Sequence, residues 1–179
     1  MTSGTSAARP GFDDLYQEII LDHNRHPRNF GALAQADRKV EGYNPLCGDR
    51  VTVFLKLGEG DGRIDDISFE GSGCAISTAS ASLMTEALKG RTVAEAEELF
   101  QKVHALLAGR EPAAPHGTDA SADPHDPDDP FGEVGKLAAL AGVRNYPMRV
   151  KCATLAWHAL HSALAPLAPI AAGAASTEA

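Results

Sequence analysis

The middle of the chain carries the pattern that most constrains the fold. Apolar residues occupy every second position in a short run made up of Val51, Val53, Leu55 and Leu57. After a glycine-containing turn at residues 58–62, apolar residues resume at Ile64, Ile67 and Phe69. Period-two alternation before such a turn and further apolar residues after it predict a β-hairpin. With a shorter strand at residues 40–43, the segment predicts a small three-stranded antiparallel sheet with one buried face.

Helical patterns stand before and after these strands. Apolar residues at helical spacing predict a first helix from Phe12 to about His23. An alanine- and serine-rich segment from Cys74 to Lys89 predicts a second helix, and Gly90 follows it as a suitable left-handed cap. The capping-box pair of Thr92 and Glu95 predicts the start of a third helix.

Two more helices are expected towards the C-terminal end. Order is expected to resume at Phe131, with a short helix through Leu137 and Leu140 that ends at Gly142. The last helix is expected from about Cys152 to Leu164. Because the strands cluster and do not alternate with the helices, the sequence predicts an α+β fold with helices packed on one face of the sheet.

The organisation along the chain indicates one domain at residues 12–165, since 179 residues suit a single core. Residues 1–11 are expected to form a flexible N-terminus, and residues 166–179 a flexible C-terminal tail. Residues 109–130 contain five prolines and several aspartates but almost nothing to bury, which predicts a mobile acidic loop.

Charge and hydropathy exclude some classes of partner. A formal net charge of −8 disfavours nucleic acid, because that affinity comes largely from lysine and arginine. No apolar run approaches the ~20 residues that a membrane-spanning helix needs, so no membrane partner is expected and the predicted location is cytoplasmic. Most of the seven histidines are expected at the surface or at the rim of a site.

The three cysteines each lie at the expected end of an element. Cys47 lies in the loop before the second strand, Cys74 at a helix start, and Cys152 near the start of the last helix. In a reducing cytoplasm they remain thiols that are available to a metal or to a sulfur donor. Helix amino termini are expected to lower the thiol pKa values of Cys74 and Cys152. Taken singly, each cysteine is equally well interpreted as a small buried hydrophobe.

If the cysteines converge, three thiolates and the carboxylate of Asp49 supply four ligands, the number that tetrahedral zinc takes. Soft sulfur favours zinc or iron over magnesium or calcium. The spacing of the cysteines matches no short zinc-binding signature, so only the fold could bring them together. Four anionic ligands leave a net negative charge, for which Arg149 and Lys151 are candidate neighbouring cations. Cys47, in a loop, suits a mobile nucleophile that accepts sulfane sulfur.

Several segments together resemble the SufU family, the zinc-binding members of the IscU-like superfamily. The resemblance covers about residues 12–164 apart from the acidic loop, and it implies an IscU-like sandwich. The segments that carry it are Leu15–Ile20, His23–Phe30, Asn44–Asp49, Gly71–Ser77 and Arg149–Trp157.

This resemblance implies a function and a set of site residues. Its implied zinc ligands are Cys47, Asp49, Cys74 and Cys152, and Cys47 is the implied persulfide acceptor. The implied partner is a PLP-dependent cysteine desulfurase of the SUF system, and PLP belongs to that partner. In the family, a histidine of the partner displaces the cysteine that matches Cys47 from zinc, and the arginine that matches Arg149 helps to arrange this exchange.

Lys151 distinguishes two functions within the superfamily. Scaffold-type IscU proteins carry histidine at this position, and imidazole is a metal ligand whereas lysine rarely is. The sequence therefore favours a zinc-dependent sulfurtransferase of iron–sulfur cluster assembly. Two alternatives remain: a scaffold on which a [2Fe–2S] cluster is assembled and transferred, and a binding module in which zinc only holds the fold together.

Overall fold

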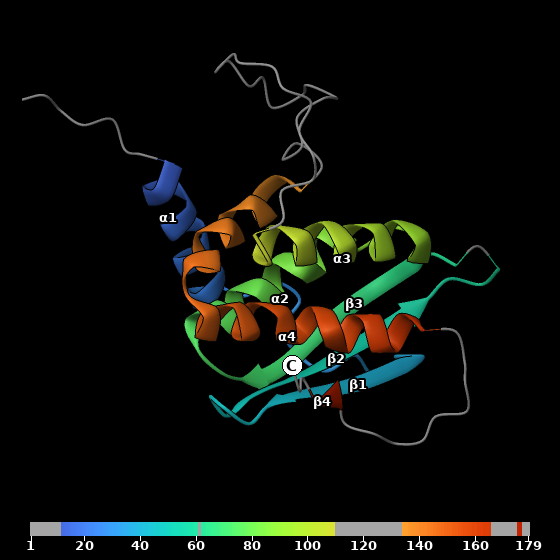
Figure 1. Cartoon of the computed structure of the whole chain (residues 1–179). Helices are drawn as coiled ribbons and strands as arrows, with labels where there is room; N and C mark the ends of the chain where they lie inside the picture. Colours follow the sequence, from blue (N-terminus) through green and yellow to red (C-terminus); the bar gives the residue numbers. More distant parts are fainter. Residues whose placement is uncertain (1–11, 61, 110–133, 166–174, 177–179) are drawn as a thin grey trace, which may run out of the picture.

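The computed structural model describes residues 12–60, 62–109, 134–165 and 175–176. One mixed sheet, with strand order β3-β2-β1-β4, forms a layer that the helices cover on one face (Figure 1). The strands are β1 (Arg38–Asn44), β2 (Asp49–Leu57), β3 (Ile64–Ser72) and β4 (Ala175–Ser176). The helices are α1 (Phe12–Arg25), α2 (Ala75–Leu88), α3 (Val93–Leu107), the 3₁₀ helix η1 (Gly135–Asn145) and α4 (Pro147–Leu164).

The core lies between the sheet and α4, which packs across β1 and β2 and also against α2. Alternate residues of β2 point into this core, and Val53 and Leu55 are completely buried there. Trp157 of α4 is buried as well, and its indole N–H donates a hydrogen bond to Ser80 Oγ on α2 at 3.2 Å. This packing fixes where α4 begins relative to the sheet.

The predicted sheet and its hairpin are confirmed. Strands β1 and β2 pair antiparallel as far as Asn44 and Asp49, so residues 45–48 form a tight loop between them. Strand β4 extends the sheet by two residues, parallel to β1, from the tail that was predicted to be flexible. An alanine–serine pair has no periodic pattern, so the sequence offered no signal for this fourth strand.

The helix predictions are confirmed for α1, α2 and α3, including the capping box and the positive φ of 84° at Gly90. The short helix was expected to end at Gly142, but η1 is of the 3₁₀ type and continues to Asn145. Over so few turns the sequence pattern does not separate a period of 3.0 from one of 3.6. Most of the predicted acidic loop, from residue 110 onwards, lies outside the described residues.

The last helix was predicted to begin at Cys152, and this was wrong. Helix α4 begins five residues earlier, with Pro147 in its first turn. Proline is favoured at that position because its fixed φ suits a helix and its missing N–H has no helical partner there. Cys152 therefore lies in the second turn of α4.

Candidate metal centre

Three chain segments that are far apart in the sequence meet at one end of the sheet, on the left in Figure 1. They are the β1–β2 loop, the beginning of α2 and the first turns of α4. The loop provides Cys47, and Asp49 opens β2 just after it. Cys74 is the residue that caps the amino terminus of α2. The fold thus brings the predicted site residues to a common region.

The polar atoms of three predicted ligands lie very close together. Cys47, Asp49 and Cys152 each present one ligand atom, and these atoms are all within 4.8 Å of one another. The sulfur atoms of Cys47 and Cys152 are 3.2 Å apart. Cys74 is not part of this group of three, but its sulfur lies 3.7 Å from Asp49 Oδ2, on the carboxylate side of the cluster. These four residues are called the cysteine cluster below.

These separations fit a divalent metal ion. Two sulfurs about 2.3 Å from a tetrahedral zinc ion lie roughly 3.8 Å apart, and a sulfur and a carboxylate oxygen roughly 3.6 Å apart. The pair of Cys74 and Asp49 already has that spacing, and the two closest sulfurs need to separate by about half an ångström. Thiolate ligands favour zinc or iron over magnesium or calcium.

Backbone conformation places these side chains. In the β1–β2 loop, Gly48 has a φ of 71° and its N–H donates a hydrogen bond to the carbonyl of Asn44 at 2.8 Å. Gly73 approaches the carboxylate so closely that a Cβ there would lie 2.9 Å from Asp49 Oδ1. The absence of that side chain lets the N–H of Cys74 donate to the same oxygen at 3.1 Å. Both glycines are therefore needed by the geometry of the site.

The two closest cysteines differ in burial. Cys47 is exposed, whereas Cys152 is buried. Burial is the main factor that raises the pKa of the Cys152 thiol, and the neighbouring Cys47, Asp49 and Cys74 raise this pKa further. The expectation that a helix terminus lowers the pKa of Cys152 was therefore wrong, because this residue lies beyond the first turn of α4.

Arg149 and Lys151 precede Cys152 on α4. Arg149 is exposed, and its guanidinium makes no hydrogen bond or ion pair with the part of the chain that the structure describes. Lys151 is partly exposed. Their predicted roles next to the site remain predictions.

Asn44 was not recognised from the sequence as a site residue. Its side chain is 1% exposed, and its amide Nδ2 donates a hydrogen bond to Cys47 Sγ at 3.0 Å. Its Oδ1 accepts a hydrogen bond from the N–H of Leu46 at 3.0 Å. The only available signal was the Asn-Pro pair, which is typical of turns and does not indicate a contact with sulfur.

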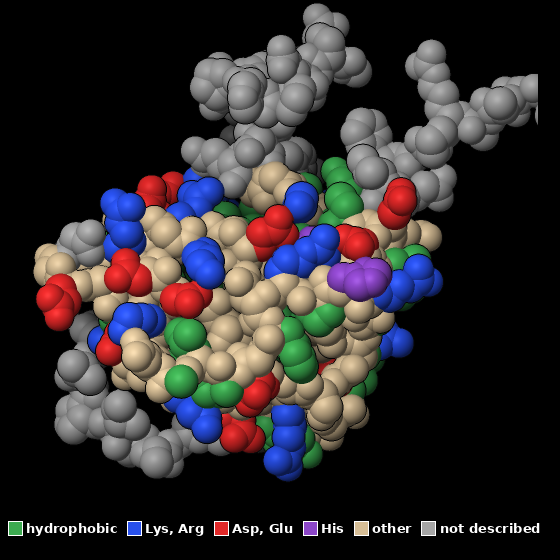
Figure 2. All heavy atoms as spheres, turned by 180° about the vertical axis from the view of Figure 1, so that it is seen from behind, with side chains coloured by type: hydrophobic (Ala, Val, Ile, Leu, Met, Phe, Trp, Pro, Cys, Tyr) green, Lys and Arg blue, Asp and Glu red, His purple; other side chains and the backbone are tan. Residues whose placement is uncertain are grey.

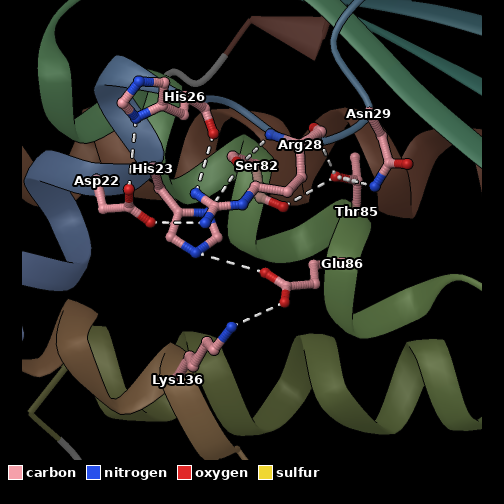
Figure 3. Close-up of polar contacts among 9 residues, drawn as sticks. All are labelled: Asp22, His23, His26, Arg28, Asn29, Ser82, Thr85, Glu86 and Lys136. Atoms are coloured by element: carbon pink, nitrogen blue, oxygen red, sulfur yellow. Dashed lines mark hydrogen bonds and ion pairs between the residues drawn. The ribbon is translucent and has the colours of Figure 1, made fainter.

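A second polar cluster, with His23 and Ser82 buried and Glu86 and Lys136 exposed, links α1, α2 and η1 (Figure 3). His23 Nδ1 is 2.7 Å from Ser82 Oγ, and His23 Nε2 is 3.4 Å from Glu86 Oε2. Lys136 Nζ donates to the other oxygen of Glu86 at 2.9 Å. We call these four residues the His23 cluster. His23 is an exception to the expectation that most histidines lie at the surface or at a rim, because it is 1% exposed.

One face of the described residues carries charges of both signs. Figure 2 shows the face opposite to that of Figure 1, where basic and acidic side chains are interspersed and the coloured residues form no continuous basic strip. Within the described residues, no helix has the length and apolar character needed to cross a membrane.

Comparisons with known proteins agree with this fold. The family "NifU-like N terminal domain" matches residues 15–153. The zinc-dependent sulfurtransferase SufU of Bacillus subtilis is 40% identical over 147 residues, which cover 82% of this chain and 87% of that protein. The iron–sulfur cluster assembly scaffold protein IscU of Streptococcus pyogenes is 37% identical, over 81% of this chain and 79% of that protein.

A solved structure supports the same comparison. The crystal structure of an iron–sulfur cluster assembly scaffold protein for the SUF system, from Fervidobacterium islandicum, matches with a TM-score of 0.69. It is 35% identical, and the match covers 86% of this chain and 99% of that one. The resemblance stated from the sequence motifs is confirmed at the level of family and fold.

Proposed function

Because the chain belongs to the family of NifU-like N-terminal domains, we propose that it acts in iron–sulfur cluster assembly as a zinc-dependent sulfurtransferase. In this proposal it accepts persulfide sulfur from a PLP-dependent cysteine desulfurase of the SUF system. The observation that carries the proposal is that the sulfur of Cys47, an exposed residue, lies 3.2 Å from the sulfur of the buried Cys152 and next to Asp49. An exposed thiol within a metal-binding cluster has the access that a sulfur acceptor needs.

The proposed zinc ligands are Cys47, Asp49, Cys74 and Cys152. The first, second and fourth are supported by their mutual distances, and Cys74 by its contact with the carboxylate. Bound zinc keeps its cysteine ligands as thiolates at neutral pH. The buried Cys152 and the half-buried Cys74 then serve as permanent ligands, and Cys47 is the one that a partner can reach.

The transfer step is an exchange of sulfur between two cysteines. The thiolate of Cys47 attacks the terminal sulfur of the partner's persulfide and forms a new sulfur–sulfur bond. The original sulfur–sulfur bond breaks, and the partner's cysteine leaves as a thiolate, so no external oxidant or reductant is needed. In this proposal Arg149, exposed one turn before Cys152, contacts the partner and helps to arrange the exchange.

Assembly of a [2Fe–2S] cluster is the second candidate function. Relatives at 37% and 35% identity are named as scaffold proteins, and a set of three cysteines and one aspartate also suits iron. Against it stands Lys151, which occupies the position where scaffold-type relatives have a histidine ligand. Lysine is a poor ligand because its amine is protonated at neutral pH.

A reducing compartment such as the cytoplasm suits the proposed function. Sulfurs only 3.2 Å apart are poised to form a disulfide, which would remove Cys47 as a nucleophile.

The test combines metal analysis with a sulfur-transfer assay. Zinc-loaded protein is expected to accelerate alanine release when it is mixed with a SUF-type cysteine desulfurase, PLP and cysteine, and mass spectrometry should locate the added sulfur on Cys47. Cys47→Ala should abolish the acceleration without unfolding the protein. Zinc-loaded protein that gives no acceleration contradicts the proposal. If the protein instead forms a coloured cluster after anaerobic reconstitution and transfers it to an apo-acceptor, it acts as a scaffold.

A further inference from the structure

The buried side chain of Asn44 has its polar atoms aimed at the β1–β2 loop. Its Oδ1 accepts from Leu46 N–H, its backbone carbonyl accepts from Gly48 N–H, and its Nδ2 donates to Cys47 Sγ. The first two bonds build the turn. The third does not involve the backbone at all, because it runs from the amide to the reactive sulfur at 3.0 Å.

An amide N–H close to a sulfur has a defined electrostatic effect. A hydrogen bond to an ionised acceptor is about twice as strong as one between neutral groups. The sulfur of a cysteine carries its full negative charge when it is free as a thiolate, and less of that charge when a divalent cation shares it. The same N–H therefore stabilises the released thiolate more than the metal-bound one.

From this geometry we propose that Asn44 is a positioning residue for Cys47. Its amide hydrogen bond favours release of the Cys47 sulfur from the bound metal, and it then holds the freed sulfur beside the cysteine cluster. The inference rests on the proposed function. Asn44 is buried beneath the loop, so it acts through Cys47 and does not contact the partner.

The fixed position of Asn44 supports this role. Asn44 is the last residue of β1 and pairs with Asp49, the first residue of β2. The donor therefore stands on the rigid end of a hairpin, while the acceptor Cys47 is on the loop. If Cys47 left a bound metal ion, the amide of Asn44 would remain in place to hold its sulfur while the loop moved.

Two substitutions separate the bond to sulfur from the bonds that build the turn. In Asn44→Ser, the hydroxyl can still accept from Leu46 N–H, as serine does in equivalent turns, but it is too short to reach the sulfur. Asn44→Ala loses both side-chain bonds. Asn24→Ser, on α1 outside the cysteine cluster, is the matched control.

The first measurement is the steady-state rate of sulfur transfer with zinc-loaded full-length protein, a SUF-type desulfurase and cysteine. For Asn44→Ser we expect kcat to fall by about ten- to a hundredfold, the effect of losing one hydrogen bond to a charged group. The KM for the desulfurase should remain unchanged, as should zinc stoichiometry. Asn24→Ser should match the wild type in all three quantities. If Asn44→Ser keeps the wild-type kcat while only Asn44→Ala loses activity, Asn44 merely builds the turn and the inference is wrong.

A second measurement does not depend on sulfur transfer. Replacing zinc by Co²⁺ gives a sulfur-to-metal charge-transfer band, and a hydrogen bond to the sulfur raises its energy because it withdraws electron density. We expect this band to shift to lower energy in Asn44→Ser and to stay in place in Asn24→Ser. An unshifted band in Asn44→Ser overturns the inference. Failure of the wild-type protein to accept sulfur, with a shifted band in the variant, instead overturns the proposed function and leaves the contact established.

Discussion

The cysteine cluster and the His23 cluster each join buried to exposed polar residues, but they satisfy their polar atoms differently. In the His23 cluster, Ser82 receives a hydrogen bond from the N–H of Arg28 at 2.8 Å and is in contact with His23, which faces the Glu86 carboxylate. Lys136 then neutralises Glu86. Each acceptor has a donor, and the negative charge has a positive partner within the protein.

The cysteine cluster contains acceptors without such a partner. Asp49 is 2% exposed, yet among the described residues no lysine, arginine or histidine donates to its carboxylate. Its hydrogen-bond donors include the N–H and the thiol of Cys74, and the Cys152 thiol also lies beside it. Burying a carboxylate without a cation costs several kcal/mol, which supports the metal ion proposed for this cluster. The His23 cluster therefore balances its charges within the protein, whereas the cysteine cluster leaves acceptors for the proposed metal ion.

The largest expected effect is a loss of zinc affinity when the cysteine cluster, and not the His23 cluster, is changed. Cys152→Ser replaces a buried sulfur ligand by a weakly binding hydroxyl, and zinc affinity should fall by at least about a hundredfold. The measurement is a competitive chelator titration together with elemental analysis of the purified protein. Thr154→Ser, two residues further along α4, is the control and should keep wild-type affinity. Wild-type zinc binding by Cys152→Ser would show that the cysteine cluster is not the metal site.

Removal of the metal should make the two closest thiols of the cysteine cluster prone to oxidation. In zinc-free protein, a mild oxidant is expected to join Cys47 to Cys152, because their sulfurs are 3.2 Å apart. Peptide mass spectrometry should find this disulfide, and zinc should no longer rebind until the protein is reduced. Bound zinc should protect both thiols. A disulfide formed equally fast in the zinc-loaded protein would indicate that these sulfurs do not hold the ion.

The His23 cluster should respond in stability and not in metal content. His23→Ala leaves Ser82 and Glu86 without a buried partner and opens a cavity, so the free energy of unfolding should fall by about 2–4 kcal/mol. Zinc stoichiometry should remain that of the wild type. His26→Ala removes a histidine that is mostly exposed, and it should change the free energy of unfolding by less than about 0.5 kcal/mol. Urea denaturation checks both values. Equal effects of the two substitutions would contradict the structural role of His23.

The sequence predicted the strands and helices well because their signals are local. Alternation in β2, the Gly90 cap and the capping box of Thr92 and Glu95 each depend on neighbouring residues. The structure brings Cys47, Asp49 and Cys152 together, as the motifs and not the spacing of the cysteines led us to expect, and their metal-binding roles stay predictions.

Features that depend on distant contacts could not be predicted in the same way. The burial of His23 is created by Ser82, which is 59 residues away, and no local pattern reports such a contact. The bond from Asn44 to Cys47 depends on the exact shape of a four-residue loop. The start of α4 was different, because Pro147 was a local signal that the prediction did not use.

The smallest expected effect concerns pH. Burial is the main cause that lowers the pKa of His23 below its usual value of 6.5, so the unfolded chain binds a proton more readily than the folded protein does. The stability due to neutral His23 is therefore complete above pH 6.5 and is lost as the pH falls through the lowered pKa. In the Cys152→Ser background, where metal binding no longer contributes, the free energy of unfolding should fall between pH 7.5 and about 5.5.

His23→Gln retains an acceptor for Ser82 and a donor for Glu86 but cannot titrate, so the decrease should be smaller in that double variant. His158, whose pKa burial also lowers, is present in both proteins and contributes equally to the two slopes. Identical slopes in the two proteins would mean that His23 does not carry this pH dependence.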